Sequence, residues 1–116
     1  MIERAEVIVL SHRLSRTRLF STGSNVTRDS VIVRVQDTAG RIGWGETYLV
    51  PGAVASCRAM AGELAGRDAD EASADLIGRP GLHRWALGAV TMALDDLRAR
   101  ARSVPLSALY GVRVRD

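Results

Sequence analysis

The sequence predicts an α+β fold, in which a three-stranded antiparallel β-meander is followed by three or four helices. Apolar residues alternate with polar ones in parts of the first 48 positions, which is the period of a strand. They recur at three and four positions later in the chain, which is the period of a helix. A turn signature at residues 37–40 separates the second and third alternating segments. The 116 residues fit one domain of ordinary size.

Strands are expected at about 2–10, 30–36 and 41–48. The second is the clearest, because its β-branched run places Val31, Val33 and Val35 on one face. In the turn at 37–40, Gly40 is expected to supply the positive φ. Residues 11–28 are polar and are expected to form a long loop between the first two strands.

Helical segments are expected at about 53–65, 70–77, 84–102 and 105–110. Gly66 is expected to end the first, and Asp70 to cap the second. In the third, Asp96 and Arg100 stand four positions apart and can form an ion pair. The apolar face of that helix is expected to consist of Leu87, Val90, Leu94, Leu97 and Ala101.

The composition narrows the class of protein. Hydrophobic residues make up 47% of the chain, which is enough for a core, although aromatic residues contribute only 4%. No apolar run approaches the roughly 20 residues that a membrane span needs, and the first residues lack the pattern of a signal peptide. Cys57 is the only cysteine, so an internal disulfide is excluded. We expect a cytoplasmic protein that does not contact a membrane.

The isoelectric point near 10.0 does not by itself indicate nucleic-acid binding. The net charge at pH 7 is only +3, and every basic residue is arginine, whose very high pKa raises the isoelectric point without adding charge at pH 7. Basic residues do not interleave with aromatic ones, as a nucleic-acid surface would require. We therefore expect no nucleic-acid partner.

Gly43-Trp44-Gly45-Glu46 is the sharpest local motif. A dinucleotide-binding fingerprint needs its glycines at a strand-to-helix turn, whereas these glycines lie within a predicted strand. Glycine in a strand allows another backbone to approach closely, or marks a bulge. Glu46 is expected to be a structural hydrogen-bond or ion-pair partner rather than a catalytic acid or base.

The polar segment 11–28 and its ends carry Arg13, Arg16, Arg18 and Arg28. Phe20, the only phenylalanine, lies among them. Two interpretations remain open for this segment. It is either a flap that holds an anionic or polar substrate, since arginine suits carboxylates, or a solvated loop with ordinary surface charge.

Residue spacing predicts no catalytic residue and no metal ligand. Asp95 and Asp96 are adjacent on a predicted helix, so their side chains point about 100° apart and cannot act as a carboxylate pair. His12, His83 and Cys57 are scattered without the spacing of metal ligands, and are expected in packing or surface positions.

The order of these motifs resembles the N-terminal domain of the mandelate racemase/muconate lactonizing enzyme branch of the enolase superfamily. The hairpin around Asp37 to Gly40 and the segment 43–46 are similar to the family's central hairpin. Residues 93–97 and Pro105 to Gly111 are similar to its last helix and exit turn. Asp95 departs from the pattern, because the family usually has an aromatic residue there.

The resemblance implies a capping domain that determines substrate specificity in a Mg²⁺-dependent racemase, cycloisomerase or acid-sugar dehydratase. In such enzymes the metal ligands and the groups that abstract a proton next to a carboxylate belong to a C-terminal (β/α) barrel. A barrel needs roughly 200–250 residues, so this chain is expected to be inactive alone. The implied partners are a barrel in cis or in trans, a small carboxylate substrate and further copies in a homo-oligomer.

By the same resemblance, two loops of this domain close over the barrel as lids, at about residues 15–25 and 48–53. The substrate-contact residues expected in them are Arg16, Arg18, Phe20, Ser21, Asn25, Tyr48 and Val50. An alternative function is a free-standing domain that binds a small ligand or a protein through its arginine-rich loop. A barrel encoded downstream would favour the first function over the second.

Overall fold

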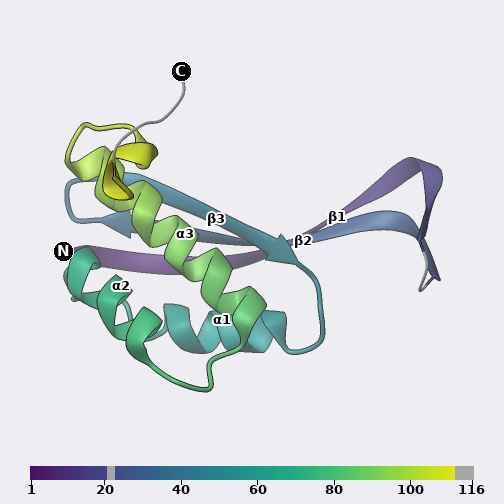
Figure 1. Cartoon of the computed structure of the whole chain (residues 1–116), viewed down its shortest axis with the longest axis horizontal. Helices are drawn as coiled ribbons and strands as arrows, with labels where there is room; N and C mark the ends of the chain where they lie inside the picture. Colours follow the sequence, from purple (N-terminus) through teal and green to yellow (C-terminus); the bar gives the residue numbers. More distant parts are fainter. Residues whose placement is uncertain (21–22, 112–116) are drawn as a thin grey trace.

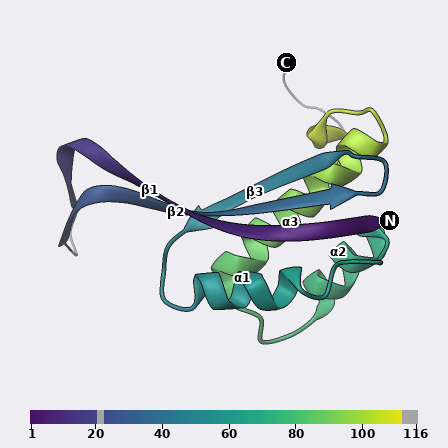
Figure 2. The same cartoon turned by 180° about the vertical axis from the view of Figure 1, so that it is seen from behind.

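The fold is an antiparallel three-stranded sheet with the helices packed on one face (Figures 1 and 2). The computed structural model describes residues 1–20 and 23–111, and for 17–20 and 23–26 it gives only the course of the backbone. The elements are β1 (Ile2–Phe20), β2 (Gly23–Asp37), β3 (Ile42–Tyr48), α1 (Ala53–Ala61), α2 (Ala69–Gly78), α3 (Arg84–Ala101) and the short 3₁₀ helix η1 (Leu106–Leu109). The predicted α+β meander with following helices is confirmed.

The sheet runs in the order β1-β2-β3, with Val33 of β2 lying between Val7 and Gly45. Val31, Val33 and Val35 are fully buried, as their alternation predicts, and face the helices. Gly40 has a φ of 84° in the turn between β2 and β3, which confirms its predicted role.

The prediction of a loop at 11–28 is wrong. β1 continues to Phe20 and β2 starts at Gly23, so both strands extend beyond the body of the sheet as a two-stranded hairpin (Figure 1). The segment is polar because none of the described helices covers this part of the hairpin, and without a buried face a strand shows no apolar alternation. The strand bounds at 2–10 and 30–36 are therefore too short.

The helices begin near the predicted residues, but two details differ. α1 ends at Ala61, and a series of turns follows it up to Gly66, where a helix to 65 was expected. The N-cap of α2 is Asp68 rather than Asp70: the Asp68 carboxylate accepts hydrogen bonds from the backbone N–H groups of Asp70 and Glu71. Asp70 instead accepts hydrogen bonds from Arg98 of α3 and from Arg102, the residue that follows this helix.

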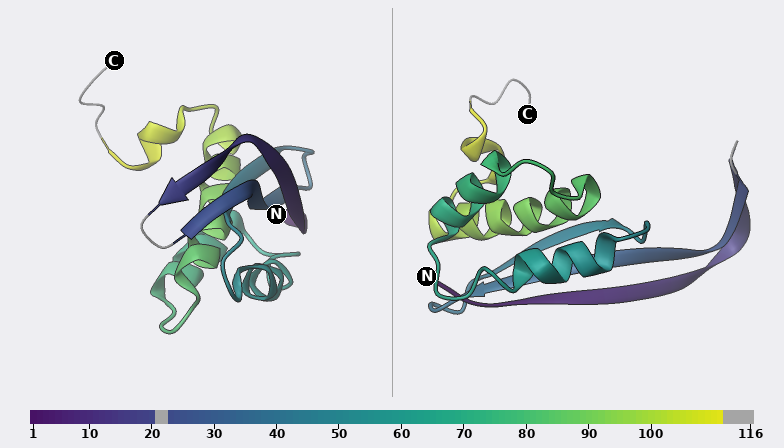
Figure 3. Two further views of the ribbon diagram at one scale, coloured as in Figure 1. Left: turned by 90° about the vertical axis from the view of Figure 1, so that its right-hand side faces the viewer. Right: turned by 90° about the horizontal axis from the view of Figure 1, so that it is seen from below.

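α3 crosses the sheet and contacts β3 backbone to backbone (Figure 3). A Cβ atom placed on Gly43 would lie 2.1 Å from the carbonyl oxygen of Ala93, and one on Gly45 would lie 1.9 Å from that of Ala89. The expected close approach of another backbone at these glycines is thus confirmed. Any side chain at either position would force the helix away from the sheet.

The buried face of α3 agrees with the predicted face except at its end. Val90, Leu94 and Leu97 are buried and Leu87 is partly buried against the core, whereas Ala101 is exposed in the last turn. The predicted ion pair between Asp96 and Arg100 forms, with 3.1 Å between Asp96 Oδ1 and Arg100 Nε. The core is completed by apolar residues of α1, α2 and α3 that cluster with the valines of β2.

Cys57 of α1 provides a test of this core. Its side chain is fully buried, and burial raises the pKa of the thiol above its ordinary value. Because the thiolate is the reactive form, we expect Cys57 to resist a thiol reagent at neutral pH in the folded protein and to react readily in urea. The rate of labelling with and without urea measures this. Rapid stoichiometric labelling of the native protein would contradict the packing of α1.

Candidate substrate-cover site

The sheet register brings the two segments predicted as lids to one end of the domain. Ser30 of β2 pairs with Leu10 of β1 and with Tyr48 of β3, and it is the first residue along β2 that pairs on both sides. Beyond Ser30 only β1 and β2 continue, as the projecting hairpin, while the chain leaves β3 toward α1 (Figure 1). The hairpin and the connection at 49–52 therefore leave the sheet together.

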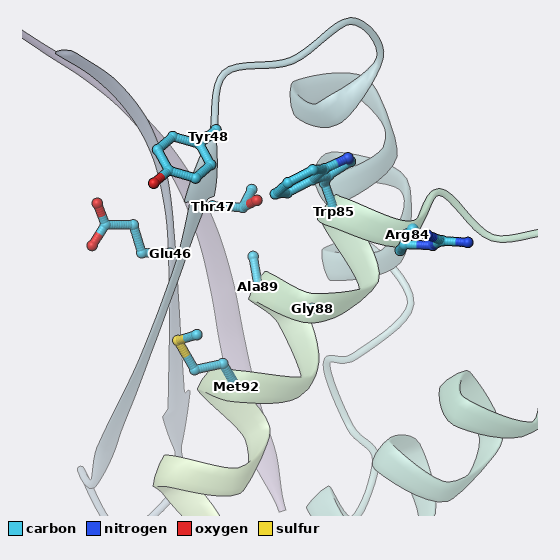
Figure 4. A pocket seen from close by; sticks show the side chains of 8 residues that line it. All are labelled: Glu46, Thr47, Tyr48, Arg84, Trp85, Gly88, Ala89 and Met92. Atoms are coloured by element: carbon cyan, nitrogen blue, oxygen red, sulfur yellow. The ribbon is translucent and has the colours of Figure 1, made fainter. Parts of the chain in front are cut away.

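A groove lies beside this end, between β3 and the first turns of α3 (Figure 4). It has a volume of about 370 Å³ and is mostly apolar. Its lining residues are Glu46, Thr47, Tyr48, Arg84, Trp85, Gly88, Ala89 and Met92.

The apolar walls of the groove are side chains that the domain leaves exposed. The Tyr48 and Trp85 rings meet edge to face, with 5.9 Å between their centroids and 71° between their planes. Tyr48 is 53% exposed, Trp85 49% and Met92 47%. Large apolar side chains gathered at one place mark interaction or binding surfaces.

The connection that follows β3 is held to the start of α3 by a histidine. His83 Nδ1 accepts a hydrogen bond from the Ala86 N–H at 3.2 Å, so that Nε2 is free to donate to the Pro51 carbonyl oxygen at 2.9 Å. Val50 turns inward and packs against the core. The backbone of the connection is thus positioned on the same helix that forms the groove.

The remaining predicted contact residues belong to the hairpin. Arg16 is exposed on β1, in a stretch where the pairing with β2 is irregular. The backbones of Arg18 and Asn25 lie opposite each other, and Phe20 pairs with Gly23. The side chains of Arg18, Phe20 and Asn25, and the whole of Ser21, lie outside the described part of the chain.

Trp85 and Met92 were missed in the sequence analysis, although a signal exists. Trp85, Gly88 and Met92 recur at three and four positions, which forms a second stripe on α3 beside the buried one. Glu46, by contrast, has the structural role expected of it: its carboxylate accepts a hydrogen bond of 2.8 Å from the Ser30 hydroxyl.

The described residues do not fit a magnesium ion. Across 1–20 and 23–111, no three His, Cys, Asp or Glu side chains gather in an arrangement that could hold a metal. Mg²⁺ requires several oxygen ligands in nearly octahedral geometry. None of the helices in this part of the chain is long and apolar enough to cross a membrane.

The antiparallel meander and the helix α3 packed on the strand with Gly43 and Gly45 form the fold of an enolase-type N-terminal domain. Residues 4–111 match the family model described as mandelate racemase/muconate lactonizing enzyme, N-terminal domain. The chain belongs to this family, within the enolase superfamily.

Known proteins of this superfamily resemble the chain in sequence and fold. A D-gluconate dehydratase from Thermoproteus tenax is 35% identical over 99 residues, which cover 75% of this chain and 20% of that protein. The structure of an enolase-superfamily member from Polaromonas sp. JS666 matches 98% of this chain and 34% of its own, with 32% identity and a TM-score of 0.78.

A dipeptide epimerase from Methylococcus capsulatus, solved with Mg and the dipeptide L-Arg-D-Lys, matches 99% of this chain and 36% of its own, with 26% identity and a TM-score of 0.81. The chain thus spans a fifth of the dehydratase's length and about a third of the length of these solved relatives.

Proposed function

We propose that this domain covers the active site of a Mg²⁺-dependent enolase-superfamily enzyme and selects its substrate. The observation that carries the proposal is the register at Ser30, which brings the hairpin and the connection after Tyr48 to one end of the domain. A cover needs mobile or adaptable segments at one end of a rigid support, because it must exclude water and position a substrate. The core beneath α3 supplies that support.

The chemistry would come from a (β/α) barrel, in cis or in trans, that holds the metal ion. The relatives include an epimerase of dipeptides and a dehydratase of a sugar acid, so the substrate is a small carboxylate whose neighbouring carbon loses a proton. The reaction is of the racemase, cycloisomerase or acid-sugar dehydratase type. The chain alone supplies the cover and no catalytic group.

The groove is the surface we assign to the barrel. Tyr48, Trp85 and Met92 expose large apolar area beside the cover segments, and burying such area stabilises an association by about 25 cal/mol per Å². Arg84 and Glu46 at its rim can form polar contacts around an apolar centre, which is the usual arrangement of an interface.

The test is proton exchange in D₂O. Together with the barrel polypeptide and Mg²⁺, the domain is expected to promote deuterium uptake at the carbon next to the carboxylate of a dipeptide or sugar acid, followed by NMR. Omission of either the domain or the metal should abolish turnover. If the barrel were equally fast and equally selective without this domain, the proposed function would be wrong.

The hairpin residues are expected to determine which substrate is used. Alanine at Arg16, Arg18 or Phe20 should change the ratio of kcat/KM between two substrates. Loss of a hydrogen bond to a charged group costs roughly 1.5–3 kcal/mol, about 10- to 150-fold in kcat/KM. Arg58, exposed on α1, provides the control R58A, which should leave the ratio unchanged. Changes below about twofold for all three hairpin variants would exclude the hairpin from substrate selection.

A further inference from the structure

The outer edge of β1 is a second surface without a partner. β1 is an edge strand, and between Arg4 and Arg13 its outer edge forms no backbone hydrogen bond to the described residues. Only Ile2 bonds outward, to Gly66 and Arg67. An edge of this length presents N–H and C=O groups that another strand can pair with. Most natural edge strands are shorter or are covered.

Regular geometry restricts the stretch that can pair. Register shifts interrupt β1 between Ile2 and Arg4 and again between Arg13 and Arg18, so the uninterrupted part is Arg4–Arg13. Val9 and Leu10 lie near its centre and are 44% and 55% exposed. An apolar centre with polar residues on both sides is the pattern of a surface that is covered by another protein.

We propose that β1 pairs with β1 of a second copy of the chain, in antiparallel orientation about a two-fold axis at Val9, to form a continuous six-stranded sheet. This inference does not depend on the proposed function, because the groove is not part of the edge and the edge shares only residues 11–13 with the hairpin. The pairing is a form of β-strand addition, with the main chain providing the hydrogen bonds.

Symmetry leaves few registers. A two-fold axis between antiparallel strands is perpendicular to the sheet, so facing residues have side chains on the same face and are an even number of positions apart. One residue must then face its own copy across the axis. The exposed centre of the edge restricts this residue to Ile8, Val9 or Leu10.

The side chains favour Val9. With the axis there, Ile8 faces Leu10 and Glu6 faces His12 of the second copy, so that apolar residues meet and a carboxylate meets a hydrogen-bond donor. Charged residues face apolar ones only toward the ends of the stretch, as where Arg4 lies opposite Leu14. An axis at Ile8 would place Arg4 opposite His12, two basic side chains. With an axis at Leu10, His12 would face Ile8 and Glu6 would face Leu14.

The shape of the domain agrees with this register. Helices lie beside the first half of β1, whereas the second half runs past them (Figures 1 and 2). Antiparallel pairing places the uncovered half of one copy beside the covered half of the other. The two-stranded hairpin then becomes part of a wider sheet, and ribbons of two strands are only marginally stable by themselves.

A disulfide across the axis tests the register. In V9C the two introduced cysteines face each other at the distance of paired strands, about 4.5–5.5 Å between Cα atoms, which a disulfide can span. In S11C each cysteine faces Val7 instead, and the pair lies four residues, about 13 Å, apart. Under mild oxidation we expect a covalent dimer of V9C and none of S11C. Buried Cys57 is not available to interfere.

A charge variant tests the same contact without a covalent bond. H12E places a glutamate opposite Glu6 twice in each dimer, whereas in the single copy residue 12 lies opposite Arg28, where a glutamate is tolerated. By sedimentation we expect H12E to weaken the dimer about tenfold, and the added change E6Q to restore most of the loss. M92E is the matched control, because it places the same residue in the groove.

The two surfaces give distinguishable results. Association that M92E abolishes and H12E leaves intact would come from the groove and would overturn the proposal. A chain that stays monomeric to about millimolar concentration, or a dimer in which V9C fails to cross-link, would also overturn it. None of these outcomes would affect the proposed cover role, which the exchange experiment decides.

Discussion

Replacement of Gly45 by alanine is expected to destabilise the domain by about 3 kcal/mol or more. The new Cβ would lie 1.9 Å from the carbonyl oxygen of Ala89, an atom of the α3 backbone that no rotamer change can move. Relief requires the helix to lift from the sheet, which separates buried residues of both layers. Overpacking of this kind costs about 1–3 kcal/mol when side chains can adjust, and more when they cannot. Thermal unfolding followed by circular dichroism should show a melting temperature lower by roughly 10–20 °C.

The control for this prediction is the same substitution at Gly88. Gly88 lies within α3, and a Cβ there would meet no atom within 4 Å. Because alanine is favoured over glycine in a helix by about 1 kcal/mol, G88A should stabilise the domain slightly. Equal melting temperatures for G45A and G88A would show that α3 does not contact β3 as described.

Replacement of Asp95 by alanine is expected to cost about 2–3 kcal/mol. Asp95 is only 7% exposed, and its carboxylate accepts hydrogen bonds from Arg98 Nη1 at 2.8 Å and from the Tyr110 hydroxyl. Without the carboxylate, the Arg98 guanidinium retains only Asp70, and Tyr110 loses its acceptor. Removal of one partner from a fully buried pair costs 3–5 kcal/mol, and the partial exposure of Arg98 reduces that figure. Urea denaturation measures the loss.

Two further measurements separate this contact from a general packing effect. R100A breaks the exposed pair with Asp96 and should cost less than about 1 kcal/mol. The hydrogen bond to Asp95, followed by burial, raises the pKa of Tyr110, so that in D95A this pKa should fall toward its ordinary value of about 10. An unchanged tyrosine titration by ultraviolet absorbance would show that the Asp95 carboxylate does not accept a hydrogen bond from Tyr110, the residue that follows η1.

Much of this fold could be predicted from the sequence because burial imposes a period. The valines of β2 alternate since one face meets the helices, and Gly43 and Gly45 occur where α3 comes too close for a side chain. The hairpin beyond Ser30 could not be predicted in this way. No helix in the described part of the chain lies against it, so its residues carry no apolar alternation, and its polarity is typical of a loop.

The candidate site was predictable only in part, for a related reason. Tyr48 lies at the end of a strand that the motif at 43–46 already located, so its position follows from the sequence. Whether Trp85 points into the groove depends on the rotation of α3 about its own axis, and the contact with Gly43 and Gly45 fixes that rotation. The sequence also could not decide between Asp68 and Asp70 as the N-cap of α2, because aspartate is a favoured N-cap residue at either position.

The direct contact between the backbones of α3 and β3 fixes the position of the helix on the sheet. The 18 residues of the helix span about 27 Å, from the first turn beside the groove to the end that η1 follows (Figure 1). Because the helix is packed directly on the strand, the helix and the sheet move together. A rotation of the domain about the η1 end of α3 therefore also moves the groove end of α3. A turn of ten degrees would displace the groove by about 5 Å, so that a small rotation at one end of the helix becomes a larger displacement at the other end.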